Sequence, residues 1–370
     1  MLDAMTLVYI LAVLVGINVF YYIFFSVFSF SKASETLALN NTEFPVSLIV
    51  CAKNEADHLQ EHIPLWLQQD YSNFELILVN DASRDETLEV MEAFAEQDER
   101  VKIVNVKNIE AFWANKKYAL TLGIKKAVHT RLVFTDADCK PGSDQWLRYM
   151  VSHFSEEKQL ILGYGAYQKS SGFLNKLIRF ETALTALQYF AYALRGIPYM
   201  GVGRNLAYTS HLFYDNKGFM SHVKIPSGDD DLFVNEAATA SNISICNASE
   251  AFTYSTPKKT WQTWWLQKRR HITTASHYQL KHKALLSFFF LGNLLFWPVL
   301  AITFFTDLWF WGLALLALRL ALQYAVYGKA FQKLKEPDLI LWLPILEVFL
   351  VSFQLSIFIS NTVSKPPRWK

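Results

Sequence analysis

Two clusters of carboxylates are the residues of this 370-residue chain best suited to chemistry. Asp136 and Asp138 are separated by one residue, so both can face one hard divalent cation whose other ligands are diphosphate oxygens and water. Such a cation offsets the charge that builds on a leaving diphosphate. Asp229, Asp230 and Asp231 are consecutive and can raise one another's pKa, which suits a general base near neutral pH. The same triplet precedes an apolar run, as at the start of a helix, and the two interpretations are compatible.

A second candidate metal motif is His58 to His62, which reads H-x-x-E-H, the pattern of inverted zinc peptidases. Pro64 follows it, and a proline there clashes with the carbonyl of Gln60 if the helix continues. The distortion disfavours a helix that aims both imidazoles at one ion. A zinc metallopeptidase is therefore the less favoured alternative.

Alternating strand-like and helical patterns precede and connect these residues. The strand-like runs are 46–51, 74–79, 101–106 and 131–135, and the helical patterns are 56–69, 85–97 and 116–128. Strict alternation of strand and helix predicts right-handed crossovers and a Rossmann-like, mostly parallel α/β sheet flanked by helices. Ligands of such sheets bind beyond the carboxyl ends of the strands.

Polar residues follow three of the predicted strands. Asn54 and Glu55 follow the first, Asp81 follows the second, and Asp136 and Asp138 follow the fourth. One edge of the sheet is thus predicted to bind a divalent cation or a hydroxyl-rich ligand. Neither GxGxxG nor GxxxxGK[ST] occurs, so a dinucleotide or ATP loop is not supported.

The composition indicates a membrane protein, because 52% of the residues are hydrophobic and only 18% are charged. Apolar runs long enough to cross about 30 Å of hydrocarbon occupy residues 7–30, 284–305, 308–327 and 339–359. The last run contains Pro344 and Glu347, so a re-entrant path is an alternative to a further span. One N-terminal and two to three C-terminal transmembrane helices are predicted. Arg319 either pairs with Glu347 inside the membrane or snorkels to an interface.

Lysines near the apolar runs favour a cytosolic middle region under the positive-inside rule. Lys32 follows the first run, and Lys329, Lys333 and Lys335 follow the third. We therefore expect an integral protein of the inner or plasma membrane. The net charge of only +2 argues against nucleic-acid binding. The predicted segments are an anchor (1–31), a catalytic domain (42–257), an amphipathic interfacial segment (258–283), C-terminal membrane helices (284–361) and a basic tail (362–370).

Two aromatic stretches outside the spans are predicted to lie near the bilayer. Residues 258–283 combine three tryptophans with Lys268, Arg269 and Arg270, as an interfacial helix does. Residues 173–194 are apolar and rich in aromatic residues. They predict either a buried core helix or a membrane-skimming one, and the aromatic excess favours the second.

Seven motifs between residues 45 and 278 resemble glycosyltransferase family 2, the inverting enzymes with a GT-A fold. They are KNE (53–55), VNDAS (79–83), NKKYALTLGI (115–124), DADC (136–139), GRNLAY (203–208), GDDDLF (228–233) and QKRRH (267–271). The resemblance implies a nucleotide-diphosphate sugar donor, a divalent cation (Mg²⁺ or Mn²⁺) and inversion at the anomeric carbon.

The resemblance also implies a role for each matching residue. Donor-binding positions are Asn54, Glu55, Asp81, Lys116, Asp136, Gln267 and Arg270, and the metal ligands are Asp136 and Asp138. Either Asp229 or Asp230 is the catalytic base, and Arg204, Asn205, Asp231 and His271 lie on the acceptor side. Asn115 stands where the family often has glycine. His271 replaces the tryptophan of the QxxRW motif, which argues against a processive synthase.

Together these observations predict a membrane-bound inverting glycosyltransferase that acts at the cytosolic membrane face. The acceptor is expected to be a hydroxyl of a lipid or a lipid-linked glycan. A processive polysaccharide synthase of the same family is the first alternative. A catalytically weak scaffold that merely binds nucleotide sugar is a further one.

Overall fold

The computed structural model describes residues 3–32, 44–107, 116–225 and 227–364. Asn115 and most of the predicted basic tail lie outside these ranges. The chain forms two compact units. One contains residues 1–32, 169–192 and 258–367, and we call it the helical unit; the other contains residues 33–168, 193–257 and 368–370, and we call it the α/β unit.

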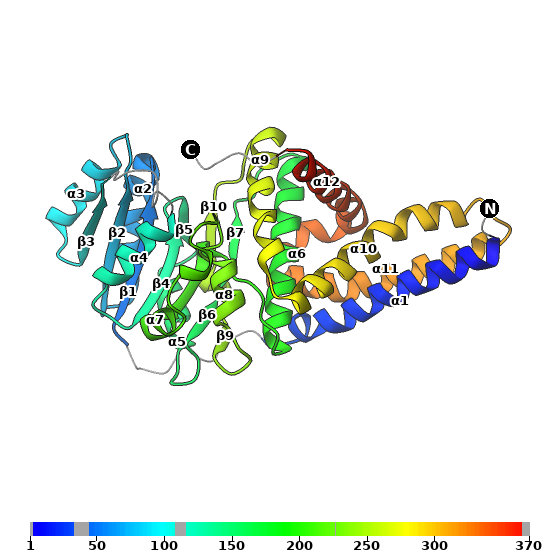
Figure 1. Ribbon diagram of the computed structural model, residues 1–370, viewed down its shortest axis with the longest axis horizontal. Coiled ribbons are helices and arrows are strands. Elements are labelled where there is room, and N and C mark those ends of the chain that lie inside the picture. Colours follow the sequence, from blue (N-terminus) through cyan, green and yellow to red (C-terminus); the bar gives the residue numbers. More distant parts are fainter. Residues whose placement is uncertain (1–2, 33–43, 108–115, 226, 365–370) are drawn as a thin grey trace. The chain divides into compact units, whose positions relative to one another are not determined.

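A twisted, mostly parallel sheet forms the centre of the α/β unit, as predicted (Figure 1). Its strand order is β3-β2-β1-β4-β8-β6-β9, in which β8 runs antiparallel to both neighbours. The strands are β1 (Val46–Ala52), β2 (Phe74–Asp81), β3 (Val101–Val106), β4 (Arg131–Asp136), β6 (Leu160–Leu162), β8 (Leu206–Thr209) and β9 (Ile243–Ile245). Every residue of β1 and β2 is buried, since helices cover both faces of a parallel sheet.

The crossover helices of this sheet begin and end close to their predicted positions. They are α2 (Ala56–Leu67), α3 (Thr87–Gln97) and α4 (Lys116–Lys126). Helices α2 and α3 contact each other, and α4 packs on β1 and β2. The strand order reverses direction between β3 and β4, so a right-handed crossover places α4 on the face opposite to α2 and α3.

Short elements complete the α/β unit and follow the central strands. They are β5 (Cys139–Pro141), α5 (Trp146–Ser152), β7 (Gly165–Tyr167), α7 (Ser210–Asp215), α8 (Asp231–Ala237) and β10 (Thr253–Ser255). Strands β5, β10 and β7 form a small second sheet in that order. Because β5 follows β4 after two residues, the small sheet supports the turn with Asp136 and Asp138.

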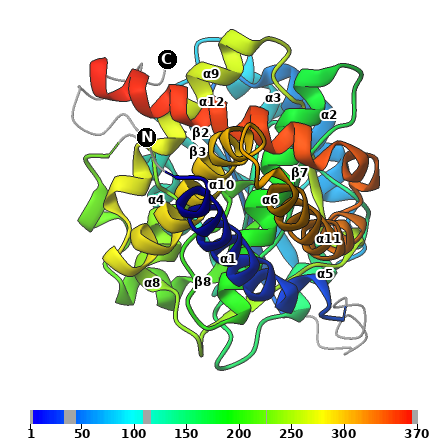
Figure 2. The same cartoon turned by 90° about the vertical axis from the view of Figure 1, so that its right-hand side faces the viewer.

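The helical unit contains long apolar helices, and four of its described helical segments are long and apolar enough to cross a membrane. They are α1 (Ala4–Ser29), α10 (Leu280–Thr303), α11 (Trp309–Lys333) and the segment Pro337–Val363, which includes α12 (Leu343–Val363). Helix α1 packs along α10 and α11, and α12 packs on α10 (Figure 2). Helices α6 (Phe173–Leu194) and α9 (Trp261–Ile272) complete the unit.

Arg319 and Glu347 pair inside the bundle, which confirms one of the two predicted alternatives and makes the snorkelling alternative wrong. The Arg319 side chain is fully buried, and its Nη2 also donates to Asn18 Oδ1 (3.1 Å) and Asn293 Oδ1 (2.9 Å). Gln323 donates to the second carboxylate oxygen of Glu347. Polar side chains from three other helical positions thus add hydrogen bonds to the buried pair.

Helix α6 is a core helix, so the preferred membrane-skimming interpretation of its aromatic face is wrong. Phe180, Tyr189, Phe190 and Tyr192 are all buried. Their rings pack on α1 and α11, where Phe190 stacks on Phe28, Tyr192 meets Phe24 and Phe180 meets Phe331. The aromatic excess is therefore taken up by contacts between helices rather than by lipid.

Candidate active site

The turns that follow β1 and β2 are tied together by hydrogen bonds. Asn54 Oδ1 accepts from Arg84 N at 2.8 Å, and Asn54 N donates to Ser83 Oγ at 3.0 Å. Asn54 and Ala82 both have left-handed backbones, with φ of 56° and 51°. Non-glycine residues hold such angles where the surrounding contacts over-determine them, as at preorganised sites. Asn54 thus holds the turn after β1 against the turn after β2 through these bonds.

Asp81, Glu55 and Asp136 lie at the same edge of the sheet, at or just beyond the ends of β2, β1 and β4. Asp81 is 5% exposed, and Lys53 Nζ lies 3.6 Å from its Oδ2. Glu55 accepts through Oε2 from the ring of His58 at 2.6 Å when Nδ1 carries the proton. The sheet therefore brings the predicted donor-binding carboxylates to one rim, and their contacts with a donor stay predictions.

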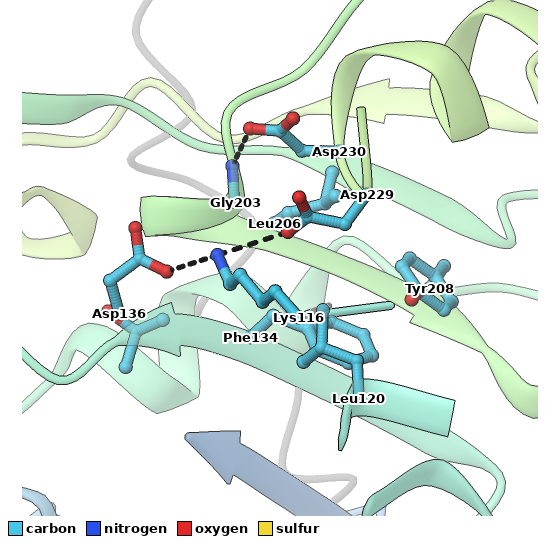
Figure 3. Close-up of a pocket in the computed structure, with 10 residues that line it drawn as sticks. Lys116, Leu120, Phe134, Asp136, Gly203, Leu206, Tyr208, Asp229 and Asp230 are labelled. Atoms are coloured by element: carbon cyan, nitrogen blue, oxygen red, sulfur yellow. Dashed lines mark hydrogen bonds and ion pairs between the residues drawn. The ribbon is translucent and has the colours of Figure 1, made fainter. Parts of the chain in front are cut away.

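Lys116 joins the two carboxylate clusters of the sequence. Its ammonium lies 2.7 Å from Asp136 Oδ1 and 3.0 Å from Asp229 Oδ2 (Figure 3). Burial alone would lower the pKa of Lys116, but Asp136 and Asp229 raise it well above its usual value. The lysine is thus a fixed cation between the turn after β4 and the acidic triplet before α8. Leu120, Phe134, Leu206 and Tyr208 line the apolar side of this pocket (Figure 3).

Asp229 and Asp230 differ in pKa although they are adjacent. Burial favours the neutral form of Asp229, yet the Lys116 ammonium holds the pKa of Asp229 below its usual value. Burial and the neighbouring Asp229 and Asp231 carboxylates raise the pKa of Asp230 to about 7. Two adjacent carboxylates with separated pKa values are a common arrangement in acid–base catalysis.

The backbone around Asp230 holds its carboxylate in place. Its Oδ2 accepts from Gly203 N at 2.7 Å (Figure 3), and its Oδ1 accepts from Asp231 N at 2.7 Å. Asp230 is the N-cap of α8, which confirms the predicted helix start. Gly228 has φ +96°, and a Cβ there would meet Leu232 Cδ1 at 2.5 Å, so this turn requires glycine.

The D-x-D turn fits a hard divalent cation. Among the described residues, Asp136, Asp138 and Cys139 form the one group of three whose ligand atoms all lie within 4.8 Å of one another. Cys139 Sγ lies 3.3 Å from Asp138 Oδ1 and 2.9 Å from Ser255 Oγ, and burial raises the pKa of this thiol well above its usual value. The thiol thus stays protonated, and Asp136 and Asp138 are the residues that would hold Mg²⁺ or Mn²⁺.

The residues predicted on the acceptor side have different environments. Asn205 is fully buried, and its amide bonds Tyr164 O (3.0 Å), Ala251 O (2.7 Å) and Trp146 Nε1 (3.1 Å). Its side chain faces the interior, so its placement does not support acceptor contact. Asp231 is 8% exposed and accepts from Leu232 N at 2.8 Å.

Arg204 is partly exposed at the boundary between the two sheets of the α/β unit. Its Nη1 lies 3.3 Å from both Ala166 O and Ser255 Oγ, and its guanidinium carbon lies 4.3 Å from the ring centre of Tyr167. These contacts fix the guanidinium, and no carboxylate of the described residues bonds it directly. A role toward an acceptor stays a prediction.

Gln267, Arg270 and His271 all lie on α9 of the helical unit. Neighbouring basic residues are used within that unit, where Lys268 pairs with Glu181 at 2.6 Å and Arg269 bonds Asn361 at 2.8 Å. Of the tryptophans predicted to face the bilayer, Trp264 is buried and stacks on Phe353 of α12. The donor-side and acceptor-side roles of the α9 residues stay predictions.

The zinc-peptidase alternative gains no support from the geometry. His62 Nδ1 contacts Ala137 O at 2.8 Å, and His58 Nδ1 contacts Glu55 Oε2 at 2.6 Å. Helix α2 continues through Pro64, yet the part of the chain that the structure describes has no three-ligand group around these histidines. Each imidazole is instead part of the structure around the carboxylate rim.

Two groups near the acidic triplet were not singled out from the sequence. One is the backbone amide of Gly203, which bonds Asp230; the GRNLAY motif marked its neighbourhood but not this contact. The other is Lys117, which is 2% exposed despite its charge. One feature of the sequence could have indicated Lys117. It is a second lysine directly after Lys116, at the start of a predicted helix in a chain with few charges.

Comparisons with known proteins agree with the geometry. Residues 47–215 match the family described as Glycosyl transferase family 2. The uncharacterized glycosyltransferase EpsJ of Bacillus subtilis is 34% identical over 127 residues, covering 34% of this chain and 35% of EpsJ. Glycosyltransferase GlyG of Streptococcus pneumoniae is 28% identical over 128 residues, covering 34% of this chain and 41% of GlyG. These matches span only about two-fifths or less of the relatives' own length.

A solved structure is similar over nearly the whole chain. It is the mannosyltransferase PcManGT from Pyrobaculum calidifontis in complex with GDP-Man and Mn²⁺, with a TM-score of 0.63. The alignment covers 98% of this chain and 100% of PcManGT at 17% identity. At that identity the likeness establishes the GT-A-like fold. The family match and the named relatives support a transferase of the glycosyltransferase type.

Proposed function

We propose that this protein is a membrane-bound, inverting family 2 glycosyltransferase. It transfers a sugar from a nucleotide-diphosphate donor to a hydroxyl of a lipid or a lipid-linked glycan at the cytosolic membrane face. One observation carries the proposal: a D-x-D turn and an acidic pair with separated pKa values share one lysine, Lys116, at the carboxyl edge of a GT-A-like sheet.

The donor end of the site is the rim formed by Asn54, Glu55, Asp81 and Asp136. A divalent cation held by Asp136 and Asp138 supplies electrostatic stabilisation for the leaving diphosphate. Lys116 adds a second positive charge at the same place, because its ammonium already contacts Asp136. From the family resemblance alone, Gln267 and Arg270 of α9 are proposed as further donor-binding residues.

Asp230 is the better candidate for the catalytic base. A base must be free of a tight cation partner and must bind a proton near working pH, and the pKa of Asp230 is raised to about 7 by burial and its acidic neighbours. Asp229 is instead engaged by Lys116 at 3.0 Å. We propose that Asp229 orients Lys116 while Asp230 takes the acceptor proton.

The transfer step follows from these roles. The acceptor hydroxyl gives its proton to an Asp230 oxygen, and its oxygen attacks the anomeric carbon from the face opposite to the diphosphate. The bond between the anomeric carbon and the diphosphate oxygen breaks, and the nucleoside diphosphate leaves with the electron pair. One displacement inverts the anomeric configuration and needs no covalent enzyme intermediate.

Membrane attachment supports an apolar acceptor. Four described helical segments are long and apolar enough to span a bilayer, and lysines near them favour a cytosolic catalytic unit. His271 in place of the family's tryptophan favours limited rather than processive addition. The GDP-Man bound by PcManGT makes GDP-mannose a reasonable first donor to assay.

The proposal is tested with membranes that contain the protein, incubated with a panel of nucleotide sugars and Mn²⁺ or Mg²⁺. We expect one donor to yield nucleoside diphosphate and a glycolipid whose mass rises by one sugar. Asp138→Asn should remove most of the activity and raise the cation concentration that the remaining activity needs, whereas Asp144→Asn, an exposed carboxylate of the same unit, should behave as wild type. Full activity of Asp138→Asn without added metal would reject the metal role.

A further inference from the structure

Lys117 is a buried lysine whose ammonium is held entirely by backbone carbonyls. Its side chain is 2% exposed, and Nζ donates to His222 O at 2.7 Å, Ile225 O at 3.0 Å and Ser227 O at 2.8 Å. An ammonium has three N–H donors, so these three bonds use all of them. The lysine therefore gathers three carbonyls of one short segment around a single point.

Lys116 and Lys117 are adjacent on α4 but serve different partners. Consecutive helix residues point about 100° apart, so they do not share a face. Lys116 reaches the carboxylates of Asp136 and Asp229, whereas Lys117 reaches the chain that precedes Asp229. The first turn of α4 thus contacts the acidic triplet in two ways. Lys116 contacts the Asp229 side chain, and Lys117 contacts the backbone that precedes the triplet.

The segment held by Lys117 leads directly into the proposed base. Ser227, whose carbonyl it binds, is two residues before Asp229, and the intervening Gly228 makes a left-handed turn with φ +96°. Among the described residues, no side chain other than Lys117 bonds Ser227 O, where the chain enters this turn before α8. The position of Asp229 and Asp230 then depends on where the carbonyls of His222, Ile225 and Ser227 lie.

Lys117 is charged at neutral pH, as its three bonds to backbone carbonyls require. Burial lowers the pKa of Lys117 to about 8, while Asp229, Asp231, Asp230 and Glu236 oppose that decrease. The ammonium form, with three donors, therefore predominates at pH 7. A neutral side chain of the same length would leave three carbonyls without this partner, which favours a different path of the segment.

We propose that Lys117 is a positioning residue for the transfer reaction, which holds the segment before Asp229 so that Asp230 stays directed at the acceptor hydroxyl. The proposal rests on the glycosyl transfer proposed above and adds to it a residue at a position that the family resemblance leaves unassigned. Lys117 acts through the backbone of the acidic triplet and does not itself touch donor or metal.

The test compares Lys117→Met with Lys125→Met in the purified full chain. Lys125 is an exposed lysine on the same helix and serves as the matched control. We expect Lys117→Met to lower kcat by about 10- to 100-fold, the usual effect of misplacing a reacting group by about 1 Å, with donor KM and donor affinity within about twofold of wild type. Wild-type kcat in Lys117→Met, or an equal loss of donor affinity, would overturn the positioning role.

Amide hydrogen exchange distinguishes a local loosening of the segment before Asp229 from a loss of the fold of the whole α/β unit. If Lys117→Met does not fold, Lys117→Gln replaces it, because an amide still donates to two acceptors and should give an intermediate kcat. Faster exchange confined to residues 222–234, with the rest of the α/β unit protected as in wild type, supports the proposal; unchanged exchange there overturns it. A wild type that transfers no sugar would reject the proposed function itself, whereas an active wild type with a fully active Lys117 variant rejects only this inference.

Discussion

At the scale of single residues, the central feature is the division of labour between Asp229 and Asp230. Lys116 lowers the pKa of Asp229 against the effect of burial, and burial with two acidic neighbours raises the pKa of Asp230 to about 7. The sequence alone left both residues open as the base, because their difference depends on contacts with Lys116 and Gly203. Those contacts join residues more than twenty positions apart in the chain.

Asp230→Asn should lower kcat by about 10²- to 10⁴-fold, the usual contribution of a general base, and leave donor KM nearly unchanged. Asp229→Asn should have a smaller effect, because Asp136 still holds Lys116 at 2.7 Å. Steady-state release of nucleoside diphosphate measures both variants. A larger loss in Asp229→Asn than in Asp230→Asn would assign the base to Asp229.

The dependence of kcat/KM on pH should report the ionisation of the same residue, Asp230. Because the pKa of Asp230 is raised to about 7, the carboxylate is protonated below that pH and cannot accept the acceptor's proton. We therefore expect kcat/KM to fall as pH decreases through about 7 and to level off above it. The residual activity of Asp230→Asn should lack this dependence, and a wild-type rate that stays constant from pH 8 to pH 6 would contradict the assignment.

At the scale of elements, the strand ends determine the site, and the turns beyond them are supported by buried polar side chains. Asn205 is the clearest case, since its amide joins Tyr164, Ala251 and Trp146 across the junction of the two sheets. A Cβ at Gly163 would meet the same amide at 2.4 Å, so the packing around it is tight.

Asn205→Ala should lower the free energy of unfolding by about 3 kcal/mol or more, because each buried polar group left without a partner costs roughly 1–3 kcal/mol. Asn216→Ala, which removes one hydrogen bond to Leu212 O at a helix end, should cost about 1 kcal/mol or less. Thermal or denaturant unfolding of the full chain in detergent measures both. Equal stability of the two variants would show that Asn205 is not a structural anchor.

The sequence predicted the elements well where a physical pattern was local. The β1 to β4 runs and the helices between them begin within two residues of their predicted starts, because apolar runs and amphipathic periods are local signals. Helix α6 was misjudged because its aromatic residues look the same whether lipid or another helix covers them. The burial of Asn205 and the role of Lys117 depend on tertiary contacts that no local pattern reveals.

At the scale of the whole molecule, the high apolar content of the chain is explained by two units that differ in the residues they contain. The α/β unit holds the acidic site, and the helical unit holds the apolar segments together with buried ion pairs, among them Arg319–Glu347 and Arg179–Glu336. Arg319 and Glu347 tie α11 to α12, and Asn18 and Asn293 extend the cluster to α1 and α10. Side-chain hydrogen bonds of this polar cluster thus join four of the apolar helices.

Removing one partner of that pair should be strongly destabilising. Glu347→Leu leaves a buried, uncompensated guanidinium and should cost about 3–5 kcal/mol, whereas the double variant Arg319→Met with Glu347→Leu should recover most of this loss. Lys329→Met, an exposed lysine on α11, is the control. Unfolding in detergent micelles measures the cycle, and a double variant no more stable than Glu347→Leu would contradict a pairwise role.

The proposed inverting transfer is tested most directly by determining the anomeric configuration of the product. The purified full chain is incubated with Mn²⁺, an α-linked nucleotide-diphosphate sugar and a lipid acceptor, and the glycolipid is analysed by NMR and mass. The account predicts a β-linked product with one nucleoside diphosphate released per sugar, and formation of both at a rate about 10²- to 10⁴-fold lower in Asp230→Asn. An α-linked product, or a β-linked product formed at full rate by Asp230→Asn, would contradict it.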